Sequence, residues 1–134
     1  MRVLVVDDES LARAYLAEQL AGIAGMEVIG QAANGFEAVK LAEELAPDVM
    51  LLDVQMPKLS GFEVLELLGN RAPAVIFVTA FDEFALRAFE VHAVDYLLKP
   101  VEPARLSAAA CERKRSAALS SAALSRAGST GFNR

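Results

Sequence analysis

The chain alternates between short apolar runs and longer segments in which apolar residues recur every three or four positions. Runs of the first kind predict strands buried on both faces, and segments of the second kind predict amphipathic helices. Strands are expected at residues 2–6, 26–32, 49–52, 74–79 and 95–98. Because five strands alternate with helices, the pattern predicts one α/β domain with a parallel sheet, right-handed crossovers and helices on both faces.

Capping and turn residues place the helices between these strands. Ser10 is expected to open the first helix, and Asn34-Gly35 supplies a turn and cap for the second. Pro103 occupies the favoured first position of a last helix. The inner face of the second helix is expected to consist of Phe36, Val39, Ala42 and Leu45.

Polar residues interrupt the pattern at the carboxyl ends of the predicted strands. Asp7 and Asp8 follow the first strand, Asp53 follows the third, Thr79 ends the fourth, and Lys99 follows the fifth. A single aspartate after a strand is more often a solvated loop residue. Parallel strands, however, end on one edge of the sheet, where α/β folds bind ligands. Three acids, a hydroxyl and a lysine on that edge therefore predict a functional pocket.

The chemistry of this set favours a divalent cation and a phosphoryl group. Clustered carboxylates raise one another's pKa unless a cation joins them. Since the set contains oxygen ligands and no His or Cys, it favours Mg²⁺ over zinc, with Asp8 and Asp53 as direct ligands and Asp7 bound through water. A carboxylate beside Mg²⁺ can form an aspartyl phosphate. Lys99 would then supply positive charge and Thr79 a hydroxyl to the phosphoryl oxygens.

Composition limits the class of protein. A chain of 134 residues, 54% of them apolar and 23% charged, suits one globular domain. Cys111 is the only cysteine, which excludes an internal disulfide and a multi-cysteine metal site. The amino-terminal apolar run is too short for a signal peptide, and no stretch approaches the ~20 apolar residues that span a bilayer. We therefore expect a cytoplasmic protein without a membrane partner.

The net charge of −5 is unevenly distributed. Residues 1–103 carry seven Lys/Arg and seventeen Asp/Glu, whereas residues 104–134 carry six and one. The acidic body argues against direct nucleic-acid binding, because phosphate contacts supply much of that affinity. We interpret the basic residues 113–115 as a solvated helix face rather than a nucleic-acid patch. The Ala/Ser-rich residues 116–134 are expected to form a linker or disordered tail.

Four motifs, taken in order, resemble the receiver domain of two-component response regulators. They are Val-Val-Asp-Asp-Glu (5–9), Leu-Leu-Asp-Val-Gln-Met-Pro (51–57), Val-Thr-Ala (78–80) and Tyr-Leu-Leu-Lys-Pro (96–100). The resemblance covers residues 1–115, the expected receiver domain. It implies a flavodoxin-like, doubly wound sheet of five parallel strands in the order 2-1-3-4-5, with five helices.

The resemblance also implies roles for the residues at the strand ends. Asp53 would accept the phosphoryl group, and Asp7 and Asp8 would bind the metal with the backbone carbonyl of Gln55. The donor would be a sensor histidine kinase. The domain would act as a switch rather than as an enzyme with ordinary turnover, because it catalyses only its own phosphorylation and dephosphorylation.

Thr79 and Lys99 resemble the switch hydroxyl and the phosphate-pairing lysine of the family, and Pro100 would follow a cis peptide bond. Thr79 and Tyr96 are expected at the ends of adjacent strands. A hydroxyl drawn toward the phosphate would there leave room for the aromatic ring of Tyr96 to turn inward.

Residues 89–100 further resemble the LytTR (LytR/AlgR-type) subgroup, whose members carry a DNA-binding domain after the receiver. We expect the present chain not to bind DNA itself and to regulate transcription through an effector domain missing from this sequence. Phosphorylation is expected to produce a homodimer through the fourth helix, the fifth strand and the fifth helix. The charged residues assigned to that contact are Glu83, Arg87, Glu90, Asp95 and Arg113.

Three alternatives remain open. The chain could be a stand-alone receiver or phosphorelay intermediate, or a pseudo-receiver, although the intact set of acids, Thr and Lys speaks against the last. A Mg²⁺-dependent phosphohydrolase resembling the haloacid dehalogenase superfamily would also form an aspartyl phosphate. Such enzymes typically place a second Asp two residues after the nucleophile, where this chain has Gln55.

Overall fold

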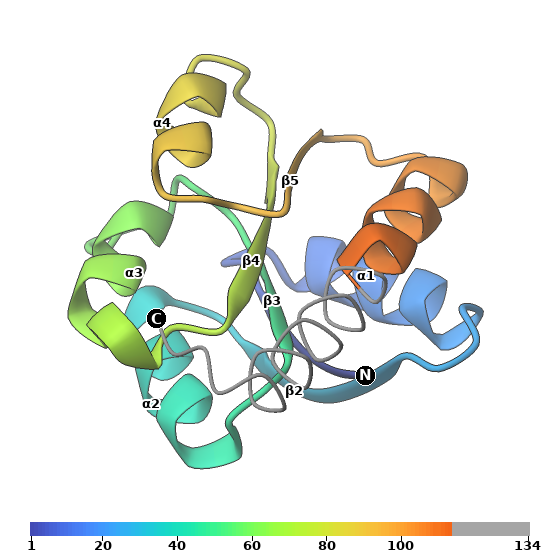
Figure 1. The fold of residues 1–134 in the computed structure, drawn as a ribbon, viewed down its shortest axis with the longest axis horizontal. Helices are drawn as coiled ribbons and strands as arrows, with labels where there is room; N and C mark the ends of the chain where they lie inside the picture. The colour runs from blue at the N-terminus through green and yellow to red at the C-terminus, as the bar shows by residue number, and fades with distance from the viewer. Residues whose placement is uncertain (114–134) are drawn as a thin grey trace, which may run out of the picture.

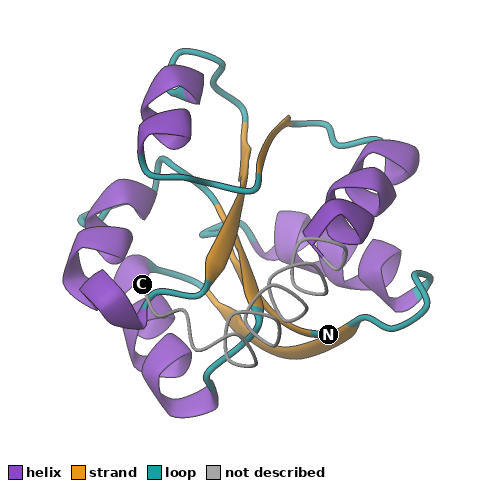
Figure 2. Cartoon of the chain, viewed as in Figure 1, coloured by secondary structure: helices purple, strands orange, loops and turns teal. Residues whose placement is uncertain are grey.

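The computed structural model describes residues 1–113, which form a five-stranded parallel sheet with helices on both faces (Figures 1 and 2). The strands are β1 (Arg2–Val6), β2 (Glu27–Ala32), β3 (Val49–Leu52), β4 (Ala74–Thr79) and β5 (Asp95–Leu98). Their order is β2-β1-β3-β4-β5, and every neighbouring pair is parallel. The predicted doubly wound order is confirmed, and only β2 begins one residue later than expected.

The helices divide into two layers. They are α1 (Ser10–Ala21), α2 (Gly35–Leu45), α3 (Gly61–Leu68), α4 (Ala85–Glu90), the short 3₁₀ turn η1 (Gly69–Arg71), and a C-terminal helix that begins at Pro103 and is described as far as Arg113. Figure 1 shows α1 and the C-terminal helix on one side of the sheet and α2, α3 and α4 on the other. Within residues 1–113, no helix is long and apolar enough to cross a membrane. The expected tail at 116–134 lies outside the described residues.

The sheet is buried on both faces because successive side chains of a strand point to opposite sides. All four residues of β3 are buried. Val49 and Leu51 pack in the cluster under α1 and the C-terminal helix, whereas Met50 and Leu52 pack in the cluster under α2, α3 and α4. Burying each such side chain contributes about 1.5–3 kcal/mol. A short, fully apolar strand is therefore held rigidly, and the residue that follows it is held with it.

Local capping agrees with the sequence, while one residue of the assigned inner face of α2 is wrong. The Asn34 side chain accepts a hydrogen bond from Glu37 N and caps α2, as predicted. Ala42 is buried as predicted, whereas Phe36 is 60% exposed and the unpredicted Ala38 faces the core. Since Phe36 lies two residues before Ala38, it is roughly 200° around the helix from it. The apolar residues of α2 occupy more of its circumference than the predicted stripe.

Gly61, at the start of α3, lies against the backbone that carries Asp53. Its N–H donates to the carbonyl of Val54 at 2.8 Å. A Cβ at this position would collide with the backbone carbonyl oxygen of Asp53 and would stand 3.2 Å from atoms of Leu52 and Val54. Because a backbone atom cannot rotate away as a side chain can, only glycine fits here. α3 thus packs directly onto the loop after β3.

We predict that Gly61→Ala destabilises the fold by about 1–3 kcal/mol, because an added methyl group forces the backbone at Asp53 to shift. Gly22→Ala is the matched control, since a Cβ there meets only Gln19 O at an ordinary 3.5 Å. Urea unfolding of both variants measures the difference. Equal stability of the two variants would contradict the close approach at Gly61.

Candidate functional site

Three carboxylates meet at the carboxyl ends of β1 and β3. Oxygen atoms of Asp7, Asp8 and Asp53 all lie within 4.8 Å of one another. Asp7 and Asp53 are buried, with 1% and 6% of their surface exposed, whereas Asp8 is exposed to solvent. The structure therefore brings together the acids that the strand-end argument placed on one edge, and Asp8 lies on the open side.

The sheet itself positions the two buried acids. Asp7 N donates to Ala32 O, and Asp53 N donates to Val6 O, both at 3.1 Å, so the ladder continues one residue beyond each strand. Each carboxylate then accepts a hydrogen bond from the backbone two residues later in the chain. Asp7 accepts a hydrogen bond from Glu9 N at 2.9 Å, and Asp53 accepts one from Gln55 N at 3.3 Å. Each acid is consequently held by its backbone and by its own side chain.

Arg13 adds a contact that the sequence did not predict. Its guanidinium, from the first turns of α1, donates to the backbone carbonyl of Asp7 at 2.7 Å. Arginine on an exposed helix is common, and the sequence contains no pattern that assigns this one to the site. The contact depends on the angle at which α1 leaves β1.

Lys99 reaches into the cluster from the end of β5. Its Nζ lies 2.6 Å from Asp7 Oδ2, 3.2 Å from Asp53 Oδ2 and 3.6 Å from a Glu9 carboxylate oxygen. The contact to Asp53 has the geometry of a hydrogen bond, whereas the contact to Asp7 Oδ2 is an ion pair without it. The bond between Lys99 and Pro100 is cis, as predicted.

Burial and charge shift the pKa values of the central pair. Burial, together with the negative charge of Asp7, raises the pKa of Asp53, although Lys99 and a hydrogen bond from Thr79 oppose the rise. Burial alone would lower the pKa of Lys99, but its contacts to Asp7 and Asp53 outweigh burial and raise it. Lys99 therefore stays protonated at neutral pH, and one ammonium does not fully offset the negative charge around Asp53.

The donor set fits a magnesium ion. Three carboxylates against one ammonium leave a net charge of about −2 in a partly buried site, which favours a divalent cation. Asp7 Oδ2 is buried and is contacted by the Lys99 ammonium at 2.6 Å, which leaves it with further lone pairs for a second cation. All the ligands are oxygens, and exposed Asp8 leaves one side open to water, as Mg²⁺ prefers. The Gln55 side chain is exposed to solvent.

Thr79 and Tyr96 are joined through the backbone of Phe81. Thr79 is completely buried, and its hydroxyl accepts a hydrogen bond from Phe81 N at 3.4 Å. The Tyr96 hydroxyl donates to the carbonyl of the same residue. Because the peptide groups of Phe81 contact both side chains, a movement of Thr79 can reach Tyr96 through one residue.

The register corrects the expected position of Tyr96. Leu98, not Tyr96, lies beside Thr79 in the sheet, and Tyr96 lies beside Phe77. Thr79 and Tyr96 nevertheless share one face of the sheet. Thr79 lies two residues after Phe77 on β4, and Phe77 is the residue beside Tyr96. The link through Phe81 could not be predicted, since it depends on the conformation of the loop after β4.

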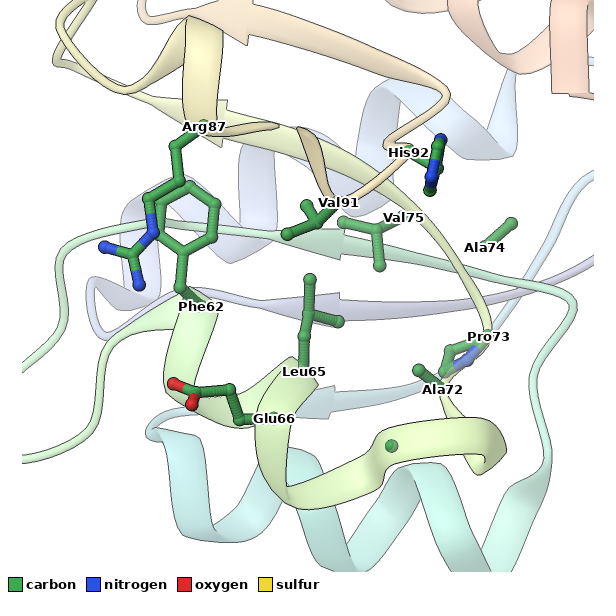
Figure 3. Close-up of a pocket in the computed structure, with 11 residues that line it drawn as sticks. Phe62, Leu65, Glu66, Ala72, Pro73, Ala74, Val75, Arg87, Val91 and His92 are labelled. Carbon is green, nitrogen blue, oxygen red and sulfur yellow. The ribbon is translucent and has the colours of Figure 1, made fainter. Parts of the chain in front are cut away.

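A cavity of about 310 Å³ between α3 and α4 lies away from the acids (Figure 3). Val75, near the start of β4, lines it, whereas Thr79 ends the same strand. On its rim the Arg87 guanidinium lies 4.2 Å from the centre of the Phe62 ring. None of the three acids lines this cavity, which is therefore separate from the candidate site.

Known proteins are similar to this chain in sequence and in fold. The chain is 50% identical to the transcriptional regulatory protein BtsR of Salmonella typhi over 107 residues, which cover 79% of this chain and 45% of BtsR. The chain thus spans less than half the length of the curated relatives it matches. The response regulatory domain of protein mrkE from Klebsiella pneumoniae superposes with a TM-score of 0.79 at 30% identity, covering 87% of this chain and 97% of that domain.

A third similarity is to a complex that contains BeF3 and Mg²⁺. A chain of the CheX-CheY-BeF3-Mg²⁺ complex from Borrelia burgdorferi superposes with a TM-score of 0.75 at 25% identity, covering 82% of this chain and 86% of that one. The response regulator receiver domain family itself matches residues 3–111. With this match over most of its length, the chain belongs to the response regulator receiver domain family.

Proposed function

We propose that this chain is a phosphorylation-activated signalling switch in which Asp53 accepts a phosphoryl group from a sensor histidine kinase. The observation that carries the proposal is the approach of Lys99 Nζ to Asp53 and Asp7, inside a cluster of three carboxylates. Such a site combines a nucleophile, a cation for the transferred group and a set of oxygen ligands for Mg²⁺.

In the proposed transfer, an Asp53 carboxylate oxygen forms a bond to phosphorus while the bond from phosphorus to the donor imidazole breaks. Mg²⁺, held by Asp7, Asp8, Asp53 and the Gln55 carbonyl, would supply charge neutralisation for the phosphoryl oxygens. Lys99 would exchange its contact to Asp53 for a phosphoryl oxygen. Thr79 would direct its hydroxyl to another phosphoryl oxygen, and this movement would pull the backbone N–H of Phe81 that is bonded to it.

The magnesium assignment is supported by a structural relative and by the ligand set. The Borrelia burgdorferi complex contains both BeF3 and Mg²⁺, as its name states. The acids of the present chain have the oxygen-only character that this ion requires. Membership in the receiver family argues against the phosphohydrolase alternative, in which Asp53 would turn over small phosphate esters.

We further propose that residues 1–115 form the receiver unit of a cytoplasmic transcription regulator of the LytTR subgroup. The name of BtsR as a transcriptional regulatory protein, and its length of more than twice the matched region, support this proposal. DNA would be contacted by a separate effector domain. The described part of the chain is acidic and would repel DNA, since residues 1–113 contain 18 Asp/Glu and only 9 Lys/Arg.

Our first prediction for this function is that acetyl phosphate adds one phosphate to the chain only when Mg²⁺ is present, and that Asp53→Asn abolishes the gain. Intact-mass spectrometry, with and without a chelator, measures it. Asp48→Asn is the matched control because Asp48 lies at the opposite end of the sheet, where it accepts a hydrogen bond from Arg2 N at 2.7 Å. Phosphate recovered on Asp7, Asp8 or another residue would refute the assignment of Asp53.

A second prediction separates the switch from the chemistry. Thr79→Ala should leave phosphorylation of Asp53 within about tenfold of wild type, because Lys99 and the acids remain. It should weaken the effect of phosphorylation on Phe81 and Tyr96, because Phe81 N loses its hydrogen-bond acceptor. Thr79→Ser keeps the hydroxyl and should behave as wild type. If Thr79→Ala abolishes the mass gain as fully as Asp53→Asn does, Thr79 serves transfer rather than signalling.

The proposed dimer face presents apolar side chains beside the charges assigned to it, of which Glu83 and Glu90 are exposed. Of the charges assigned to it, Asp95 forms a double hydrogen bond with Arg105 of the C-terminal helix at 2.8 Å, and Arg87 lies over Phe62. The most exposed apolar side chains of α4 are Leu86 (73%) and Phe89 (79%). We propose that phosphorylation brings this face against a second copy, together with β5 and the C-terminal helix.

A third prediction follows for assembly. Beryllofluoride with Mg²⁺ should convert wild type from monomer to dimer in light scattering, and Phe89→Ser should prevent dimerisation without changing the phosphate gain. Leu67→Ser, at a 53% exposed position on α3, is the control and should still dimerise. Monomers in both states would refute the dimer, and sequence-selective DNA binding by this chain at stated salt would refute the separate effector.

A further inference from the structure

The side chain of Tyr15 connects α1 to the segment that carries Lys99. Its hydroxyl donates a hydrogen bond to the backbone carbonyl of Val101 at 2.7 Å, across 86 positions of sequence. Val101 is buried, whereas Tyr15 is 40% exposed and lies at the rim of the fold. This bond joins two elements that the sheet ladder does not connect.

Lys99 depends on the backbone on either side of it. On the strand side, its N–H donates to Thr79 O at 2.8 Å, which continues the ladder between β4 and β5. Beyond Pro100 the ladder has ended. In the described part of the chain, the contact that fixes the Val101 carbonyl is the one from the Tyr15 hydroxyl.

Packing covers one side of this segment, where Val101 belongs to the core cluster under α1 and the C-terminal helix, and leaves the other side open. A hollow of about 450 Å³ is lined by Tyr15, Lys99, Pro100 and Val101, together with Leu11, which is exposed. One wall of the Lys99 segment therefore faces an opening rather than a filled core. Its ammonium must still stay 3.2 Å from Asp53 Oδ2. In addition to the packing of Val101, the bond from the Tyr15 hydroxyl is a directional restraint on this segment.

We propose that Tyr15 is a positioning residue for phosphoryl transfer, acting through the Val101 carbonyl to keep the Lys99 ammonium at Asp53. The inference rests on the proposed function of Asp53. Tyr15 touches none of the reacting atoms. It restrains residues 99–101 and so keeps the Lys99 ammonium in place. Small displacements of such a group reduce the rate, because the transferred oxygens need the charge at contact distance.

The test is Tyr15→Phe, which removes the hydroxyl and keeps the ring. We expect the rate of phosphate gain from acetyl phosphate to fall roughly two- to tenfold, the range of one neutral hydrogen bond. The affinity for Mg²⁺ alone should not change, because Asp7, Asp8 and Asp53 are held by β1 and β3. Leu11→Ala is the control, since Leu11 lines the same hollow and makes no side-chain hydrogen bond. It should phosphorylate at the wild-type rate.

A double-mutant cycle with Lys99→Ala identifies the route. If Tyr15 acts through Lys99, adding Tyr15→Phe to Lys99→Ala has no further effect on the rate. Should Lys99→Ala react too slowly to time, the NMR resonance of the Lys99 ammonium decides, and Tyr15→Phe should displace it. An unchanged rate in Tyr15→Phe, an equal loss in the Lys99→Ala background, an unmoved resonance or a parallel loss of Mg²⁺ affinity would each overturn the proposal. Failure of wild type to gain phosphate would instead refute the proposed function.

Discussion

The constraint on which the site depends is the electrostatic cost of burying the carboxylates of Asp7 and Asp53 next to each other. Two like charges in a partly buried site repel each other, and Lys99 compensates only in part. The arrangement persists because each acid follows a strand buried on both faces, so the sheet fixes the backbones regardless of the side chains. The packing energy of the core thereby maintains a cluster of carboxylates whose mutual repulsion a cation would relieve.

The site contains one firmly held part and one adjustable part. The acids are anchored by ladder hydrogen bonds and by the contact of Gly61 with the Asp53 backbone. Lys99 and Thr79 stand at the ends of β5 and β4, where the chain leaves the sheet. A group that binds to both parts can therefore draw the loops toward the acids while the acids stay in place, as a switch requires.

Aromatic side chains of α3, β4 and β5 pack against one another beside α4. The rings of Phe62 and Phe77 lie 4.9 Å apart, and Tyr96 lies 6.1 Å from Phe77. The Tyr96 hydroxyl meanwhile holds the carbonyl of Phe81. α4 spans only six residues, of which Ala88 alone is buried. A short helix attached through aromatic contacts and exposing Phe89 is an element whose position can change at low cost.

The sequence by itself determined the strands and the acids at their ends, because short apolar runs stopped by Asp, Thr or Lys form the buried strands of a parallel sheet, whereas the order of the strands came from the resemblance to the receiver family. Tertiary structure alone decided that Phe36 faces solvent, that Asp95 pairs with Arg105 inside the chain, and that Phe81 links Thr79 to Tyr96. It also brought Tyr15 to Val101. Such contacts depend on the rotation of each helix and the course of each loop, which are set by packing between distant segments and leave no periodic trace in the local sequence.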